Sequence, residues 1–92
     1  MSLIRIETLV NDGHKYEYLL SVTESTQLSS FHLQLYSIEI RLTLKDGSYT
    51  NYVAHDLFSD SEKAIRFFEM LVEKLVTPID LPYVIEDTLF VK

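Results

Sequence analysis

Ser59-Asp60-Ser61-Glu62 separates two halves of the chain that differ in the spacing of their apolar residues. Before this stretch the apolar residues recur at every second position, and after it they recur with helical spacing. A serine followed three residues later by a glutamate is the pattern of a capping box, which begins a helix. The chain is therefore predicted to be a single α+β domain over 1–92 with the order ββββαα. We expect a four-stranded antiparallel meander sheet, one long helix packed on one face, and a short C-terminal helix.

Strands are predicted over 3–10, 14–23, 36–44 and 48–54, where apolar and polar residues alternate. The side chains expected to face the helix are Ile4, Ile6, Tyr18, Leu20, Val22, Ile38, Ile40, Leu42, Tyr52 and Ala54. The positions between them are mostly charged or hydroxylated. This alternation is typical of an antiparallel sheet with one face in water, so one layer of helix is enough to cover it.

The two turn signals Asn11-Asp12-Gly13 and Lys45-Asp46-Gly47 each allow a loop of two or three residues. In the first hairpin a three-residue loop places Ile6 opposite Tyr18, whereas a two-residue loop places Glu7 there. Apolar cross-strand pairs stabilise a sheet, and the same choice pairs apolar residues in the second hairpin. We therefore predict three-residue loops in both hairpins.

Apolar residues change phase by one position within the segment that leads into the third strand. They occupy odd positions from Phe31 to Leu35 and even positions from Tyr36 onward. Because such a slip would turn one apolar set to solvent, either a β-bulge lies near Leu35-Tyr36-Ser37 or residues 31–35 pair separately. The bulge is the alternative that we favour.

A helix is predicted over 60–76 because its apolar residues form one continuous stripe. The stripe consists of Ala64, Ile65, Phe68, Leu71, Val72 and Leu75. Pro78 disfavours helical geometry at Thr77 and ends this helix. Asp80 then has the character of an N-cap, and a second helix is predicted from Leu81 to about Leu89.

Composition limits the classes of partner and compartment. The 92-residue chain has a net charge of −6 and a pI near 4.8, which disfavours binding to a phosphate backbone. It contains no cysteine, which excludes disulfides and thiolate zinc sites and suits a reducing compartment. No basic region followed by a long apolar run, and no stretch of about 18 apolar residues, occurs in the sequence. We expect a cytoplasmic protein that binds neither nucleic acid nor membrane.

The ending Val76-Thr77-Pro78-Ile79-Asp80-Leu81, with Glu86-Asp87 after it, resembles a family of small clostridial and other Firmicutes proteins that is a domain of unknown function. The segment Tyr36-Ser37-Ile38-Glu39-Ile40, followed by Asp46-Gly47, is similar to the central hairpin of the same family. The resemblance implies a bacterial cytosolic protein. It implies no activity and supplies no catalytic residue.

Candidate catalytic and metal-binding groups are few. His14, His32 and His55 are the only imidazoles, and none has a second histidine at helical ligand spacing. His55 and Asp56 would need Ser59 or Ser61 within hydrogen-bond reach to act as a catalytic trio. Adjacent residues of a strand point to opposite faces, and the sequence has no glycine-built oxyanion loop. We therefore assign no catalytic residue, metal ligand or cofactor.

Some apolar residues are predicted to lie outside the core. Phe67 borders the apolar stripe of the first helix, and Met70 falls on its polar side, while Leu19, Tyr49 and Val53 interrupt the polar face of the sheet. Together with two uncovered sheet edges, they predict a partner-binding surface. We expect a non-enzymatic protein-interaction module. Its partner could be a second copy of the chain, in a homodimer, and the alternative is a plain monomer.

Two other functions remain open. One is a small-molecule site in the seam between sheet and helix near Tyr18 and Tyr52, and the other is a minor enzyme built around His55 and Asp56. The first requires an enclosed pocket between helix and sheet, and the second requires the catalytic trio to assemble.

Overall fold

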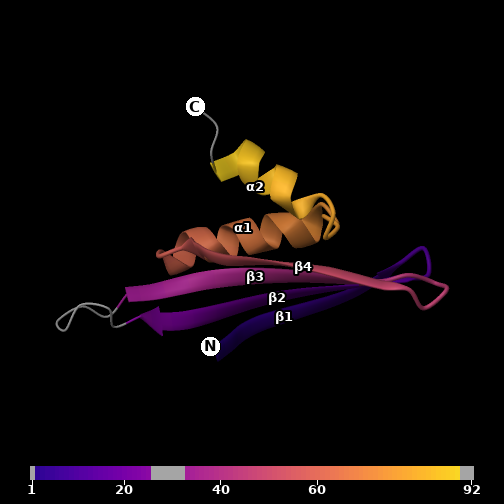
Figure 1. The fold of residues 1–92 in the computed structure, drawn as a ribbon, viewed down its shortest axis with the longest axis horizontal. Helices are drawn as coiled ribbons and strands as arrows, with labels where there is room; N and C mark the ends of the chain where they lie inside the picture. Colours follow the sequence, from indigo (N-terminus) through magenta and orange to yellow (C-terminus); the bar gives the residue numbers. More distant parts are fainter. Residues whose placement is uncertain (1, 26–32, 90–92) are drawn as a thin grey trace.

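The chain folds as one four-stranded antiparallel sheet followed by two helices, as the computed structural model of residues 2–25 and 33–89 shows (Figure 1). The elements are β1 (Ser2–Asn11), β2 (His14–Ser25), β3 (Leu33–Thr43), β4 (Tyr49–Phe58), α1 (Ser61–Glu73) and α2 (Leu81–Leu89). The strands are ordered β1-β2-β3-β4, so the predicted α+β meander is confirmed. The first helix is shorter than predicted and ends at Glu73.

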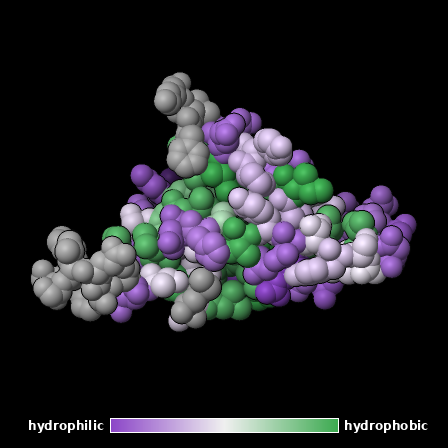
Figure 2. Space-filling view, viewed as in Figure 1, coloured by the Kyte–Doolittle hydropathy of each residue, from purple (hydrophilic) through white to green (hydrophobic). Residues whose placement is uncertain are grey.

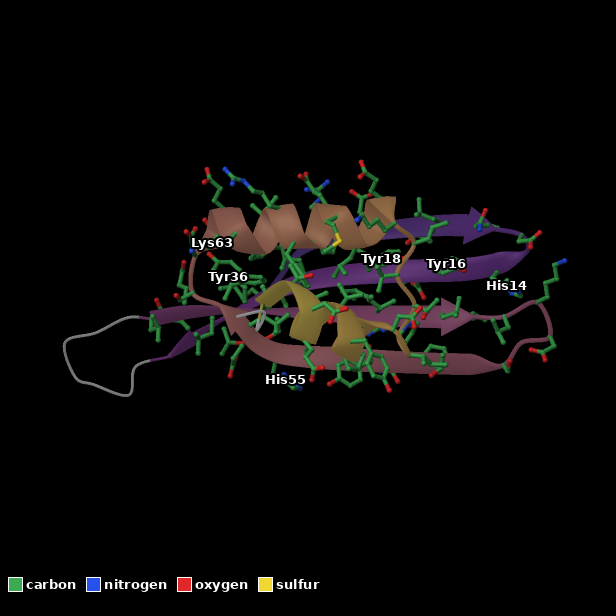
Figure 3. The ribbon with its side chains drawn as sticks, turned by 90° about the horizontal axis from the view of Figure 1, so that it is seen from above. His14, Tyr16, Tyr18, Tyr36, His55 and Lys63 are labelled. Carbon is green, nitrogen blue, oxygen red and sulfur yellow. The ribbon has the colours of Figure 1, made fainter. Side chains whose placement is uncertain are left out.

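Both helices lie on the same side of the sheet, with α2 farther from it than α1 (Figure 1). Seen from above, α1 runs along the β1–β2 side and α2 lies toward β3 and β4 (Figure 3). The core between these layers is apolar. Its most deeply buried side chains are Tyr18, Leu20, Ile38, Ile40, Ala64, Phe68, Leu71 and Leu81. The predicted inward residues of β2 and β3 thus form the sheet side of the core.

The first hairpin has a two-residue loop, and the prediction of a three-residue loop there is wrong. Asn11 pairs with His14, and both Asp12 (φ 57°) and Gly13 (φ 81°) have positive φ angles. Positive φ at both central positions defines the type I′ turn, whose twist matches that of the flanking strands. As a result Glu7, and not Ile6, lies opposite Tyr18.

This register turns Ile6 away from the helices, so Ile6 is not in the core as predicted. A register shift between Leu3 and Arg5 marks a bulge, and Ile4, which falls within it, is 47% exposed. Burial of Ile6 would gain little on an edge strand that the helices cover sparsely. Instead, the Arg5 guanidinium donates to Glu69 of α1 at 2.9 Å and lies 5.4 Å from the centre of the Phe68 ring.

The second hairpin has the predicted three-residue loop. Leu44 and Ser48 close the loop through a backbone N–H···O bond of 2.8 Å, and the Gly47 N–H donates to the Leu44 carbonyl. Gly47 has a φ of 89°, the left-handed conformation expected at a G1 bulge. The Asp46 carboxylate accepts two bonds from Ser48, which lower the pKa of Asp46.

A register shift lies near the predicted position, between Tyr36 and Ile38, but β3 itself runs in unbroken register with β2 from Thr43 to Leu33. The irregularity lies on the opposite strand. Tyr36 pairs with Phe58 and Ile38 with Ala54, so β4 contains extra residues between Ala54 and Phe58. Asp56 in this bulge has a φ of 54° and donates its backbone N–H to the buried Ser37 hydroxyl. Phe31 and His32 lie outside the described residues.

The structure begins and ends α1 with two recognisable caps. The Asp60 carboxylate accepts the Glu62 N–H at 2.9 Å, so Asp60 is the N-cap within the predicted capping stretch. At the other end the Val76 N–H donates to the Leu71 carbonyl and the Leu75 N–H to the Val72 carbonyl. These bonds form a Schellman motif, which stops the helix before the predicted Val76.

The Schellman motif predicts a stabilising substitution. Leu75 occupies the left-handed position with a φ of 52°, which costs a residue with a Cβ roughly 1–2 kcal/mol. Leu75→Gly removes that strain, while the greater freedom of glycine in the unfolded chain costs about 0.4–1 kcal/mol. We expect a net gain of about 0.5–1 kcal/mol in the free energy of unfolding, measured by urea denaturation. Leu75→Ala, which keeps the Cβ, is the control and should show no gain.

Candidate functional site

The sheet face that points away from α1 and α2 is the candidate site, and we call it the open face. One cross-strand row on it, in strand order, consists of Ile6, Leu19, Glu39 and Val53. Leu3 lies nearby on β1, opposite Ser21. Leu3 is 55% and Ile6 48% exposed. Hydrophobic side chains are visible along the lower margin of the sheet, on the side away from the helices (Figure 2).

A partly open hollow of about 410 Å³ lies on this face. Leu3, Leu19 and Val53 give it an apolar lining, and Ser21 and His55 contribute polar atoms. Figure 3 places His55 at the β4 edge of the sheet. Glu39 and Arg41 of β3 also line the hollow, which therefore combines apolar and polar side chains, as protein-binding surfaces do.

The Glu39 carboxylate of the open face is paired within the chain. The Arg41 guanidinium donates to Glu39 at 2.9 Å, and the Asn51 amide donates to the same carboxylate at 3.0 Å. The hydrogen bond from Arg41 lowers the pKa of Glu39, with a further contribution from Asn51. Glu39 thus stays ionised with its oxygens bonded, and a partner can cover it without leaving an unpaired charge.

Three of the five predicted partner-binding residues lie on the open face. Leu19 and Val53 belong to the central row, and both are half-buried. Tyr49 pairs with Thr43 near the second turn and is 57% exposed. The sequence pattern placed these three residues on the same face of the sheet. Their role in binding stays a prediction.

The predicted exposure of Phe67 is wrong. Phe67 is only 6% exposed, and its ring lies 5.5 Å from the ring of Phe58. Met70 is half-buried and packs against the same core. A second hollow, of about 330 Å³, is lined by both residues together with Leu89 of α2. α2 covers part of α1 that the sheet alone would leave exposed. Phe67 and Met70 are therefore less exposed than the sequence predicts.

Ile6 is a residue of the open face that sequence reasoning missed. It was expected to face the helix, and the two-residue loop places it opposite Leu19 instead. The signal that could have found it is the Asp12-Gly13 dipeptide, which favours a type I′ turn.

A comparison with known families decides the family of the chain. Residues 1–90 match the model of DUF6514, described as a family of unknown function. The chain belongs to DUF6514. The predicted membership of a domain-of-unknown-function family is thereby confirmed. No curated protein and no solved structure is significantly similar to the chain.

The His55–Asp56 pair of this DUF6514 member lies at the β4 bulge. The Asp56 backbone N–H is bonded to the Ser37 hydroxyl at 2.9 Å, and Ser37 is buried. Of the proposed nucleophiles, Ser61 is the first residue of α1 and Ser59 directly precedes the Asp60 cap. In the described part of the chain, no three histidine, aspartate or glutamate side chains are placed to hold a metal ion.

The seam between sheet and helix is filled by the protein itself around Tyr18. Tyr18 is fully buried, and its hydroxyl donates to the Val76 carbonyl at 3.0 Å. Ile40 separates it from Tyr52 along the same cross-strand row, and Tyr52 is 39% exposed. The two tyrosines therefore share a face of the sheet without being neighbours. Within residues 2–25 and 33–89, neither helix has the length and apolar character that a membrane crossing requires.

Proposed function

We propose that this DUF6514 member is a non-enzymatic protein-interaction module and that its binding surface is the open face of the sheet. The observation that carries the proposal is the central row, in which Ile6, about half exposed, lies beside Leu19, and Val53 follows on the other side of Glu39. An apolar group of this kind, rimmed by polar residues, is typical of a protein-binding surface. A partner that covers this apolar group would gain about 25 cal/mol of binding free energy for each Å² of apolar area removed from water.

The polar groups of the open face favour a protein partner over a small ligand. The hollow is partly open, and its charged side chains, Glu39 and Arg41, are engaged with each other. A small-molecule site normally offers convergent polar groups that are free to bind the ligand. A flat or gently curved protein surface needs only complementary shape and satisfied charges.

The proposed setting is the cytoplasm of a bacterium of the Firmicutes. The support for it is the resemblance of the C-terminal Val76–Asp80 stretch and the absence of cysteine from the sequence. Neither the setting nor the partner-binding role depends on a catalytic group.

Single-cysteine crosslinking tests the binding surface, because the chain contains no cysteine of its own. Thr8 on β1 faces the same side as Ile6 and is exposed, while Thr88 on α2 is exposed on the helical side. Thr8→Cys and Thr88→Cys, each carrying a photoactivatable thiol label, are returned to a lysate of producing cells and irradiated. We expect protein adducts from position 8 and at least tenfold fewer from position 88.

Adducts of any mass at position 8 support the open face as the binding surface. Equal labelling at both positions, or adducts from position 88 alone, would contradict it. Both variants must retain the circular dichroism of the wild-type chain, which exposed threonine-to-cysteine changes should preserve.

A further inference from the structure

The charges of the open face distinguish it from the rest of the chain. Its charged side chains are Lys15, Glu17, Glu39 and Arg41, which sum to zero. The whole chain has a net charge of −6, so the excess of negative charge lies elsewhere. Two copies of this chain carry like net charge and repel each other, and this repulsion is reduced when two open faces meet, because the charges of each open face sum to zero. A strongly charged partner would find no complementary field on this face.

Charge pattern and apolar content together specify the partner. We propose that the open face binds a second copy of this chain, so that two sheets pack face to face in a two-fold symmetric dimer. The inference rests on the proposed function and names its partner. A two-fold interface brings the same patch of both copies together, so a patch that holds equal numbers of positive and negative groups can complement itself.

The area of the open face is sufficient for such a dimer. Four strands about 4.8 Å apart and roughly ten residues long, at about 3.3 Å per residue, cover about 600 Å². Two copies that cover this face completely would bury about 1,200 Å², which reaches the lower end of the range for specific protein complexes. The interface would include the apolar side chains of Leu3, Ile6, Leu19 and Val53.

Face-to-face packing is favoured over pairing of sheet edges. Both edge strands are irregular: β1 has a register shift between Leu3 and Arg5, and β4 has its bulge between Ala54 and Phe58. Bulges disrupt the row of backbone groups that a neighbouring strand would need. Two antiparallel sheets, in contrast, pack through their side chains at a separation of about 10 Å.

Burial of the central carboxylate does not oppose the dimer. Glu39 lies between Leu19 and Val53 in the central row, so it would be covered. Its oxygens already accept bonds from Arg41 and Asn51 of the same copy. An ion pair that is hydrogen-bonded before association avoids the large cost of an unpaired buried charge.

Analytical ultracentrifugation over a wide range of chain concentration tests the proposal. The wild-type chain is expected to approach twice its mass of 10.7 kDa as the concentration rises. Ile6→Glu adds a charge within the apolar part of the open face and should weaken association at least tenfold. Ile79→Glu makes the same kind of change at a residue that is 70% exposed in the turn between the helices, and it should leave association unchanged.

A flexible bis-maleimide provides a second measurement that does not depend on Ile6→Glu remaining folded. Thr8→Cys should be trapped as a covalent pair of chains, and Thr88→Cys should not. A wild-type chain that stays monomeric at every concentration would overturn self-association, as would a dimer that Ile79→Glu abolishes and Ile6→Glu does not. Adducts of other masses at position 8 in the lysate, combined with a monomeric purified chain, would retain the proposed function and reject only the second copy.

Discussion

Phe68→Asp is expected to leave the chain without a cooperative unfolding transition. Phe68 is fully buried at the centre of the contact between α1 and the sheet. Removal of a buried phenylalanine side chain costs about 3–5 kcal/mol, and an unpaired buried carboxylate adds several more. Domains of this size have a total stability on the order of 5–15 kcal/mol, so the sum is comparable with the whole.

The nearby arginine does not rescue this variant. Arg5 lies over the Phe68 ring, but its guanidinium is already bonded to Glu7 and Glu69. Circular dichroism during heating measures the effect, and Glu73→Ala, at an exposed position of the same helix, is the control with a change near zero. A sharp transition of Phe68→Asp close to the wild-type midpoint would show that α1 does not cover the sheet as described.

Tyr18→Phe is expected to lower the free energy of unfolding by about 1–3 kcal/mol at neutral pH. The Tyr18 hydroxyl donates to the Val76 carbonyl within the Schellman motif, and phenylalanine leaves that carbonyl without this donor. Phenylalanine keeps the aromatic ring, so the loss of stability reports the hydrogen bond and not a cavity. Urea denaturation of the two proteins measures the difference.

The difference in unfolding free energy between the wild-type chain and Tyr18→Phe is also expected to depend on pH. Burial raises the pKa of Tyr18 in the folded chain, with a smaller contribution from Tyr16, whereas the unfolded chain ionises near pH 10. The stability that the neutral hydroxyl contributes is therefore fully present below about pH 10 and is lost as the pH rises toward the folded-state pKa. The difference between wild type and Tyr18→Phe should shrink above about pH 10. A difference that stays constant or grows would contradict a buried, neutral Tyr18.

The alternation of apolar and polar residues predicted most of the fold, because in the central strands the apolar positions are the buried ones. In β2 and β3 the alternation of Tyr18 with Leu20, and of Ile38 with Ile40, follows the covered face directly. The second turn was also predicted correctly, since the three-residue loop keeps Ile40 opposite Tyr52. At these positions turn chemistry and hydrophobic pairing favour the same register.

The first hairpin could not be predicted in this way because the two influences disagree there. Pairing of apolar residues favours Ile6 opposite Tyr18, and the Asp12-Gly13 dipeptide favours a type I′ turn. The turn prevails since β1 is an edge strand, where burial is small and Arg5 finds partners on α1. The bulge was expected within β3, whereas its extra residues lie on β4, where the Asp56 N–H is bonded to Ser37. The apolar phase change in β3 therefore does not reveal which strand carries the bulge.

The candidate site was predicted only in part. The residues that were misassigned depend on tertiary packing, which the sequence pattern does not reveal. Leu19, Tyr49 and Val53 were placed on the exposed sheet face by alternation alone. Phe67 and Met70 were assigned to the same role because the sequence does not reveal that α2 packs beside α1. Ile6 was assigned to the core through the register error. The open face is consequently more apolar than its sequence pattern indicates.

The register of β1 against β2 is the basis of the open face, and cross-strand nuclear Overhauser effects measure it directly. Backbone contacts between Glu7 and Tyr18, together with side-chain contacts between Ile6 and Leu19, are expected in the isotope-labelled chain. They would establish that Ile6 points away from the helices. Backbone contacts that place Ile6 opposite Tyr18, with the Ile6 side chain against Phe68, would contradict the account and remove the apolar centre of the proposed binding surface.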